Sequence, residues 1–456
     1  MYFLAGPPLA QTARAPSRGG KLVVGQEAEP KTLNPLFALD DPSKEVIGRL
    51  TADLISIDRQ TQTAKPALAE WCHVSLDGLH YTIRLRSGLR FSDGHPFDAD
   101  DVVFSLQVSL DEKVHAMQRD LLIIHGKPLS VVKMDAHTVR FDLPAVYGPG
   151  ERLFDSVPML PRHLLERAYQ EGKLSEMWGL DTKPEEMAGM GPFRVKEYRA
   201  GKYLLLERNP YYWKSPLPYL DELEFLFVGD EEAQIAKFIA GDLDLLNHVS
   251  ARNVGLLRNL GFAVHDLGPG LEYSALVFSV TNEWFGRLAF RQAVSAAINR
   301  ENIIELVYGG LASSKLVVEK HSNERAKQLL VSAGFGWTTD GALHDRSGRP
   351  VEFTIGVAAG SPDRSAMAAL IQDDLKKIGM NVQIAPNRQQ DEVALVGLSE
   401  VADERPLIRL VSPHVLVAAK PRVQNFRPVI FDHHTLWNAD ELFVGEGKAK
   451  GQATRR

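Results

Sequence analysis

The sequence predicts an α/β protein of two or three domains. The chain has 456 residues, more than the roughly 250–300 residues at which one hydrophobic core stops growing. Short segments with an apolar residue at every second position predict half-buried strands, and amphipathic helical segments lie between them. Residues 351–384 hold a strand, a helix and a second strand in turn. A crossover of that length predicts that the two strands pair in parallel.

Both ends of the chain are expected to lie outside the folded part. Residues 1–20 include a short apolar start, and Ala13-Arg14-Ala15 has the small-x-small form of a signal-peptide cleavage site. Two interpretations stay open: a tail, or the end of a secretory signal that begins upstream. Residues 446–456 are expected to be a disordered tail.

From residue 21 the chain predicts a strand followed by a helix. Lys21–Gly25 is the expected strand, and the two prolines within residues 29–35 exclude a helix there. Ser43 is expected to cap the next helix. The apolar face of that helix carries Val46, Ile47, Leu50 and Leu54.

Residues 73–97 predict strands joined by tight turns. Asp77-Gly78 and Asp93-Gly94 supply the turn residues. The alternating apolar positions are Tyr81, Ile83 and Leu85. Asp98 is expected to cap the following helix, because two further aspartates in the first turn suit the positive end of the helix dipole.

The middle of the chain predicts further strands and one helix. Residues 139–143 alternate and stop at Pro144. Residues 193–195 and 203–206 are expected to pair antiparallel through the turn at Ala200-Gly201. The next strand and helix are predicted over residues 223–227 and 233–239, with Gly241 ending the helix.

The second half of the chain predicts helices and one parallel pair of strands. Residues 286–308 are expected to be helical and to end at Gly309-Gly310, where glycine accommodates a left-handed turn. Residues 351–355 and 382–384 are the expected parallel strands. The helix over residues 366–378 lies between them and carries its apolar residues on one side.

Composition and charge exclude several kinds of partner and site. The net charge is −6, and the basic residues form no stripe that could follow a phosphate backbone, so nucleic acid is not expected as a partner. Cys72 is the single cysteine, which excludes an intrachain disulfide and a multi-cysteine metal site. We interpret it as a small core residue rather than a nucleophile.

The sequence contains no catalytic signature. The Gly-x-Ser-x-Gly elbow, the His-Glu-x-x-His helix and the Gly-x-x-x-x-Gly-Lys loop are all missing. His433-His434 could suggest a metal site, but neighbouring residues on a strand point to opposite faces, so a loop is the better interpretation. We therefore expect no cofactor, no metal and no enzymatic activity.

Several short phrases, taken in chain order, resemble a known family. They are Glu29–Pro35, Leu85–Gly94, Phe97–Ser105, Gly191–Phe193, Arg208–Trp213, Gly241–Asp244, Arg291–Arg300 and Leu436–Asn438. The family they resemble is the extracytoplasmic solute-binding proteins of family 5, which includes the oligopeptide- and dipeptide-binding receptors of ABC importers. Asn299 stands where the family usually has aspartate, and the resemblance extends over residues 21–443.

The resemblance implies a two-lobed fold of the type II periplasmic-binding-protein kind. It also implies an extra subdomain in the first lobe and, in this chain, a shortened second lobe. The expected first lobe comprises residues 21–51, 186–268 and 412–445, the extra subdomain residues 52–185, and the second lobe residues 269–411.

The resemblance further implies a function in transport. The chain is expected to capture peptides, either oligopeptides or dipeptides, by closure of its two lobes and to deliver them to a membrane permease and its ATPase. It would act as a monomer in the periplasm or at the cell surface. The alternatives are another small solute on the same scaffold, or a degenerate or chaperone-like protein that binds none.

Five residues correspond by position to ligand-binding positions of the family. Leu39, Asp40 and Asp41 correspond to a binding strand of the first lobe, Asn247 to a cleft residue, and Tyr273 to the entry of the second lobe. The alternative for the two aspartates is a solvated loop that caps the next helix. The alternative for the tyrosine is a core aromatic ring whose hydroxyl is hydrogen-bonded.

One departure from the family bears on binding. Where the family continues through a sizeable part of its second lobe, this chain has only residues 387–404 between Ile384 and Pro406. In the peptide receptors that section contributes a binding strand and an acidic group for the amino terminus of the peptide. Incomplete binding, a different ligand and a degraded copy all stay open.

Overall fold

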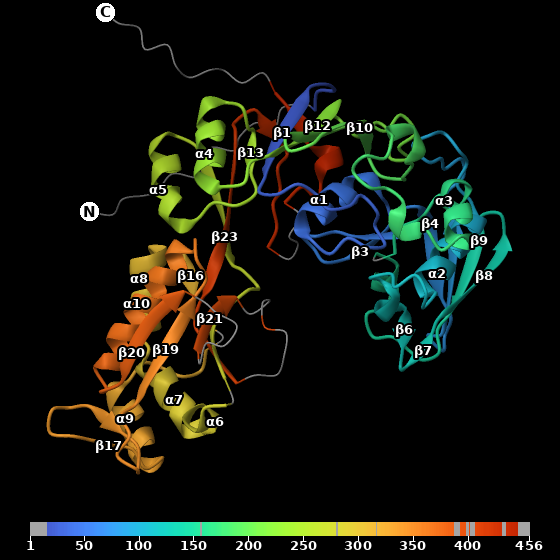
Figure 1. The fold of residues 1–456 in the computed structure, drawn as a ribbon. Coiled ribbons are helices and arrows are strands. Elements are labelled where there is room, and N and C mark those ends of the chain that lie inside the picture. Colours follow the sequence, from blue (N-terminus) through green and yellow to red (C-terminus); the bar gives the residue numbers. More distant parts are fainter. Residues whose placement is uncertain are drawn as a thin grey trace, which may run out of the picture. The chain divides into compact units, whose positions relative to one another are not determined.

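The computed structural model describes residues 16–155, 157–279, 281–315, 317–386, 393–397, 401, 406–430 and 435–445. The chain folds into two compact units, whose elements are labelled in Figure 1. The first unit holds Met1–Asn247 and the return segment Ala419–Arg456, and the second holds His248–Ala418. The lobe boundaries predicted from the sequence lie after residues 268 and 411 instead. That division stays a prediction. Residues 1–15 and the predicted tail 446–456 lie outside the described residues.

Five neighbouring strands form the sheet of the first unit, in the order β10-β11-β12-β1-β13. β1 (Lys21–Gln26) runs parallel to β12 (Glu222–Phe227) and to β13 (Leu245–Leu246). β11 (Tyr203–Arg208) pairs antiparallel with β12 and with β10 (Phe193–Arg199). The predicted first strand and the predicted antiparallel pair are confirmed. Because β12, β1 and β13 are parallel, their carboxyl ends meet at one edge of the sheet.

Helix α1 (Asp41–Leu50) begins earlier than the sequence suggests. The carboxylate of Asp40 accepts a hydrogen bond from the backbone N–H of Ser43 at 3.0 Å and caps the helix. The prediction of Ser43 as the cap is therefore wrong, because an ionised carboxylate is a stronger acceptor than a hydroxyl. The Ser43 hydroxyl instead donates to that carboxylate and accepts from the backbone of residues 31 and 32. Leu54 lies beyond the helix.

A four-stranded antiparallel sheet lies within residues 52–185, the range predicted to form an extra subdomain. Its order is β4 (Ala69–Val74), β5 (His80–Leu85), β9 (Thr138–Asp142) and β8 (Ser130–Asp135). The predicted alternation is confirmed, because the side chains on the apolar face of β5 are buried. These are Tyr81, Ile83 and Leu85.

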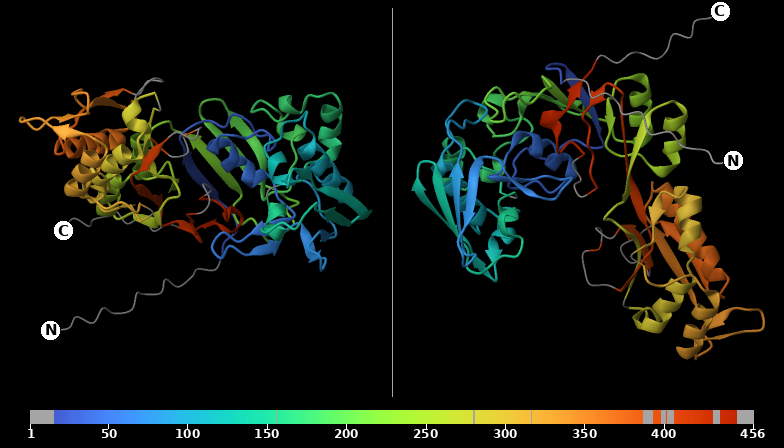
Figure 2. Two further views of the ribbon diagram at one scale, coloured as in Figure 1. Left: turned by 90° about the horizontal axis from the view of Figure 1, so that it is seen from below. Right: turned by 180° about the vertical axis from the view of Figure 1, so that it is seen from behind.

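Helix α2 (Ala99–Leu110) packs on this sheet, which Figure 2 shows in blue to teal from two further sides. Asp98 caps the helix, and the carboxylate of Asp101 accepts a hydrogen bond from the backbone N–H of Asp98, so the predicted cap is confirmed. Val102 and Leu106 of the helix enter the core of the subdomain.

The remaining elements of the first unit are short or lie at its surface. α4 (Glu231–Ala240) ends at Gly241 as predicted, with a φ of +97° that glycine adopts readily. The other helix is α3 (Arg162–Gln170). The short strands are β2 (Ile55–Ile57), β3 (Ala64–Pro66), β6 (Ile123–Ile124), β7 (Lys127–Pro128), β24 (Val423–Gln424) and β25 (Phe443–Val444). Single 3-10 turns occur at Arg119–Leu122, Gly150–Asp155, Leu174–Glu176, Pro184–Glu186 and Ala439–Glu441.

The second unit contains a five-stranded mixed sheet in the order β20-β19-β21-β15-β22. β19 (Glu352–Val357) runs parallel to β20 (Asn381–Pro386) and to β21 (Val393–Gly397). The predicted parallel pair is therefore confirmed. β15 (Ser274–Phe278) pairs antiparallel with β21 and with β22 (Leu407–Arg409).

Three helices occupy residues 283–308, where the sequence predicts a single helix over residues 286–308. These are α6 (Glu283–Gly286), α7 (Leu288–Ala297) and α8 (Arg300–Tyr308). The break between α7 and α8 lies at Asn299. The side chain of Asn299 caps α8, and its backbone N–H donates to the buried carboxylate of Asp374 at 2.8 Å. Capping competes with helix continuation, and the single predicted helix is wrong in this respect.

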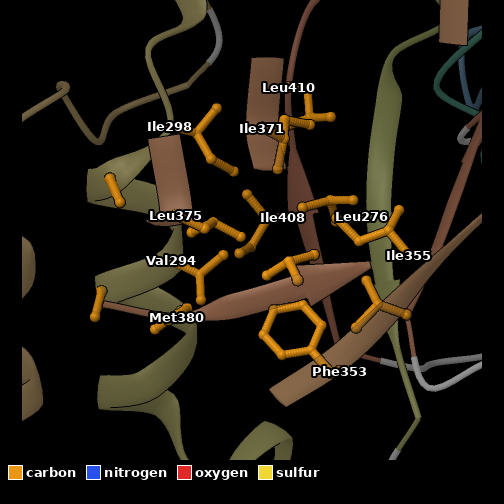
Figure 3. Close-up of a cluster of buried hydrophobic side chains, with 14 of the residues drawn as sticks. Leu276, Val294, Ile298, Phe353, Ile355, Ile371, Leu375, Met380, Ile408 and Leu410 are labelled. Carbon is orange, nitrogen blue, oxygen red and sulfur yellow. The ribbon is translucent and has the colours of Figure 1, made fainter. Parts of the chain in front are cut away.

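Helices of the second unit cover its sheet and share one apolar core with it. α10 (Pro362–Lys376) is the helix predicted between the parallel strands. Figure 3 shows side chains from α7 and α10 meeting side chains from β15, β19 and β22. Labelled members are Leu276, Val294, Ile298, Phe353, Ile355, Ile371, Leu375, Met380, Ile408 and Leu410.

The other elements of the second unit are α5 (Ala251–Asn259), β14 (Ala263–Pro269), β16 (Ala312–Ser313), α9 (Asn323–Ser332), β17 (Gly336–Trp337), β18 (Leu343–His344) and β23 (Ser412–Ala419). No helix in the described ranges is long and apolar enough to cross a membrane.

One buried carboxylate joins the return segment to the sheet of the first unit. Asp244, just before β13, is almost fully buried, and its carboxylate accepts the backbone N–H of Val23 at 2.9 Å. The guanidinium of Arg422 binds the same carboxylate with two parallel hydrogen bonds of 2.5 Å. Such two-pronged pairing is strong and directional. The backbone of Lys420 also donates to the Asp244 carbonyl at 2.8 Å.

We predict that Asp244→Asn destabilises the first unit by about 3 kcal/mol, since it breaks a charge pair whose acid is buried. The measurement is urea unfolding, combined with hydrogen exchange of the β1 amides. Asp242→Asn is the matched control, because its carboxylate is exposed and 3.8 Å from Lys237; its expected effect is below about 0.5 kcal/mol. Equal losses in the two variants would contradict the assignment.

The thiol of Cys72 is expected to be unreactive. It lies on β4 in a partly buried position, and burial, with a smaller contribution from the charge of Glu151, raises the pKa of the thiol to about 12. At pH 8 only about one thiol in 10,000 is then the reactive thiolate. We predict that iodoacetamide modifies native Cys72 about a thousand-fold more slowly than the same residue in urea. Equal rates would show that the site is open and that the pKa is ordinary.

Candidate functional site

Polar side chains gather at the edge of the first-unit sheet where its parallel strands end. Gln26 is the last residue of β1, and Asn247 directly follows β13. The register pairs Gly25 with Leu246, which brings Gln26 level with Asn247 on the neighbouring strand. In open α/β sheets, ligands bind outside the carboxyl ends of the strands. This edge is therefore the candidate binding site.

The return segment adds a third polar group to this edge. Thr435 is buried, and its hydroxyl donates to the side-chain oxygen of Asn247. The next residue, Leu436, belongs to the same apolar core as Leu22 and Val24 of β1. Since side chains alternate along a strand, Gln26 lies on the same face of β1 as these two residues.

Gln26 has an unusual environment. Its side chain is 7% exposed, and neither the nitrogen nor the oxygen of its amide has a hydrogen-bond partner within the described part of the chain. A buried amide without partners costs more free energy than one that is paired. Sequence reasoning did not find Gln26 or Thr435. A polar residue at the end of an apolar strand was the available signal for Gln26.

Aromatic and charged contacts within the return segment hold its parts together. The guanidinium of Arg427 lies 5.2 Å from the ring centre of Trp437 and pairs with Glu441. The indole N–H of Trp437 donates to the Arg427 carbonyl at 2.6 Å. Asn438 donates to the Asn425 carbonyl at 2.8 Å. These contacts hold the stretch that carries Thr435.

A partly buried ion cluster supports the same segment. The hydroxyl of Tyr212 donates to Asp440 at 3.1 Å, and the ammonium of Lys214 lies 3.0 Å from the same carboxylate. Burial, reinforced by the charge of Asp440, raises the pKa of Tyr212 well above its ordinary value. The phenol therefore stays neutral and keeps its hydrogen bond at physiological pH.

The predicted site residues of the first unit differ in their environment. Leu39 is 66% exposed. Both carboxylate oxygens of Asp40 accept from the Ser43 hydroxyl, at 2.9 and 2.8 Å, so the helix-capping alternative describes its side chain. Asp41 is exposed and 3.8 Å from Lys44. Asn247 is hydrogen-bonded to Thr435, and Asp40 caps α1. A ligand-binding role for Leu39–Asp41 stays a prediction.

Tyr273 belongs to the second unit and is buried, just before β15. Its binding role stays a prediction as well. His433 and His434 lie outside the described residues. In the part of the chain that the structure describes, no group of three or more histidine, cysteine, aspartate or glutamate side chains could hold a metal ion.

A depression lies at the surface of the second unit. It has a volume of about 480 Å³, and it includes Gln372 and Asn381. Both amides are already engaged, since Gln372 donates to the Val382 carbonyl at 2.7 Å and Asn381 to Glu352 at 2.9 Å. The edge at Gln26 is the better candidate because the amide of Gln26 lacks partners among the described residues.

Comparison with known proteins agrees on one family. The chain is 29% identical to the oligopeptide-binding protein AppA of Bacillus subtilis over 394 residues, which cover 82% of this chain and 70% of that protein. It is 27% identical to a probable ABC transporter-binding protein of Deinococcus radiodurans, over 78% of this chain and 66% of that protein. Heme-binding protein A of Haemophilus influenzae is also 27% identical, over 82% and 72%.

Solved structures share the fold. AppA of Bacillus subtilis in complex with a nonapeptide matches with a TM-score of 0.74 and 24% identity, over 95% of this chain and all of that chain. NikA of Brucella suis in complex with Fe(III)-EDTA matches with a TM-score of 0.75 and 18% identity, over 93% of this chain and all of that chain. The expected α/β periplasmic-binding-protein fold is confirmed.

A family model matches residues 63–394, and its description is bacterial extracellular solute-binding proteins, family 5 Middle. That range covers most of both compact units. The predicted membership is confirmed, and the chain belongs to the bacterial extracellular solute-binding proteins of family 5.

Proposed function

We propose that the chain captures peptides for an ABC importer. The observation that carries the proposal is the polar edge of Gln26, Asn247 and Thr435 at the carboxyl ends of parallel strands, in a member of a solute-binding family. The name of the relative from Bacillus subtilis, an oligopeptide-binding protein, supports peptides as the ligand class. Its structure in complex with a nonapeptide shows that the shared fold accommodates them.

The chemistry of this edge suits a peptide backbone. Its three side chains are uncharged. The Thr435 hydroxyl is engaged with the oxygen of Asn247, while the amide of Gln26 offers an N–H donor and an oxygen acceptor that both lack partners among the described residues. A peptide repeats one donor and one acceptor at every residue, so such groups bind it with little regard to its side chains. We propose that the exposed segment Leu39–Asp41 contributes through its backbone, and Tyr273 through its hydroxyl.

The proposal includes the mode of capture and the place of action. The two lobes, with boundaries after residues 268 and 411, would close on a peptide that contacts both. The peptide's higher affinity for the closed state would drive closure. The chain would act as a monomer, in the periplasm or at the cell surface, and would deliver peptide to a permease and its ATPase. We propose no catalytic role.

A second candidate function is the binding of another small solute. Structural neighbours of the same fold bind Ni(L-His) and Fe(III)-EDTA, so the fold does not fix the ligand. Because the stretch between Ile384 and Pro406 is short, a third alternative is a protein of this fold that binds no solute.

We predict that short peptides raise the melting temperature of the purified chain. A ligand at 100 times its dissociation constant stabilises a protein by about 2.7 kcal/mol, which corresponds to a shift of about 5 °C for a unit of this size. The measurement is a thermal-shift screen of di- to octapeptides. Free amino acids and the two metal chelates are the comparison arms. A shift with a chelate alone would favour the second function, and a flat response in every arm would contradict both.

We predict that Asp40 acts on stability rather than on affinity. Asp40→Ala removes the cap of α1 and lowers the free energy of unfolding by about 1 kcal/mol. Asp40→Asn keeps a capping oxygen, so its effect is expected to stay below about 0.5 kcal/mol. Peptide affinity, measured by calorimetry, is expected to be the same in both variants and the parent. A large loss of affinity in Asp40→Asn would show instead that the carboxylate binds the ligand.

A further inference from the structure

We propose that the side-chain amide of Gln26 pairs with one peptide group of the bound solute. The inference rests on the proposed function and deepens it, because it names the group that the site recognises. The amide nitrogen of Gln26 would donate to a peptide carbonyl, and its oxygen would accept from a peptide N–H.

The first argument is the unsatisfied state of Gln26. Its side chain is 93% buried, since it is 7% exposed, and both polar atoms of its amide lack partners among the described residues. Buried amides in folded proteins are almost always hydrogen-bonded. A ligand that pairs with this amide removes an existing penalty and breaks no hydrogen bond of the side chain.

The second argument is location. Gln26 ends β1 at the edge where β12, β1 and β13 all present their carboxyl ends. The register brings it level with Asn247, whose own side chain is held by Thr435. Two carboxamides on adjacent parallel strands are thus about 5 Å apart along the edge, a spacing that suits contact with one extended backbone.

The third argument is chemical complementarity. A carboxamide carries a donor and an acceptor side by side, and a peptide group offers the same pair in reverse. An ester, a carboxylate or an N-methylated amide lacks one of the two. A site built to pair with a donor rejects a ligand that lacks it, because a buried group is then left unpaired.

The amide atoms of Gln26 are covered by the chain, so pairing requires the amide to turn toward the ligand. The small exposed fraction of the residue lies on its other atoms. Glutamine has several rotatable side-chain bonds, and no hydrogen bond opposes this turn.

Gln234 provides an internal comparison. It is as buried as Gln26, at 5% exposure, and it packs near Gly25 of the same strand. Its amide nitrogen, however, donates to the Val228 carbonyl at 3.0 Å. Gln234 is therefore a structural glutamine whose hydrogen-bonding capacity serves the fold.

The test compares Gln26→Met with Gln234→Met in the full chain. Methionine has a similar length without an amide. The probe is the tightest-binding peptide of the thermal-shift screen, and its affinity is measured by calorimetry. Gln26→Met is expected to raise the melting temperature of the unliganded chain and to weaken peptide binding at least ten-fold. Gln234→Met is expected to lower that temperature and to leave affinity within two-fold.

A series of peptides, each N-methylated at one position, identifies the partner group. One position is expected to weaken binding to the parent at least ten-fold and to have little further effect in Gln26→Met, because both changes remove the same hydrogen bond. Unchanged affinity in Gln26→Met overturns the inference while the parent's peptide binding upholds the proposed function. A parent that binds no peptide overturns both.

Discussion

The buried carboxylate of Asp244 is the interaction on which the first unit depends. It binds the backbone of β1 and the guanidinium of Arg422, which lie more than 170 residues away from it in opposite directions along the chain. The chain leaves the first unit after Asn247 and returns at Ala419. Bringing the return segment back to the first unit across the intervening residues 248–418 costs conformational entropy. The directional ion pair of Asp244 and Arg422 specifies where the segment binds.

The candidate site is a consequence of this arrangement. Asp244 stands directly before β13, so the hydrogen bonds that attach it to Val23 also fix the register of β13 on β1. That register brings Asn247 beside Gln26. The return segment is attached to the sheet by Arg422, and the contact of Arg427 with Trp437 joins two of its own parts. It brings Thr435 to the same edge. Three residues from three distant parts of the chain thereby form one polar edge.

Local chemistry explains what the sequence could predict. The alternation in β5, the glycine after α4 and the strand–helix–strand order around α10 each depend on residues close in the chain, and all three appear in the structure. Competition between neighbouring caps explains the error at Ser43, and the side chain of Asn299 explains the break between α7 and α8. Gln26 and Thr435 could not be predicted as a site, because their proximity depends on strand register and on a segment some 400 residues away.

The location of the polar edge in the first unit also bears on the predicted shortening of the second lobe. By resemblance, the section missing between Ile384 and Pro406 supplies an acidic group for the amino terminus of a peptide. The polar edge of the first unit is uncharged and does not involve that section. A shortening of that kind would remove the recognition of a charged terminus and would leave the hydrogen bonds of this edge to a peptide backbone intact. A receptor of this composition would hold its ligand at the peptide groups and would tolerate variation in length, since no fixed charge would mark where the peptide begins.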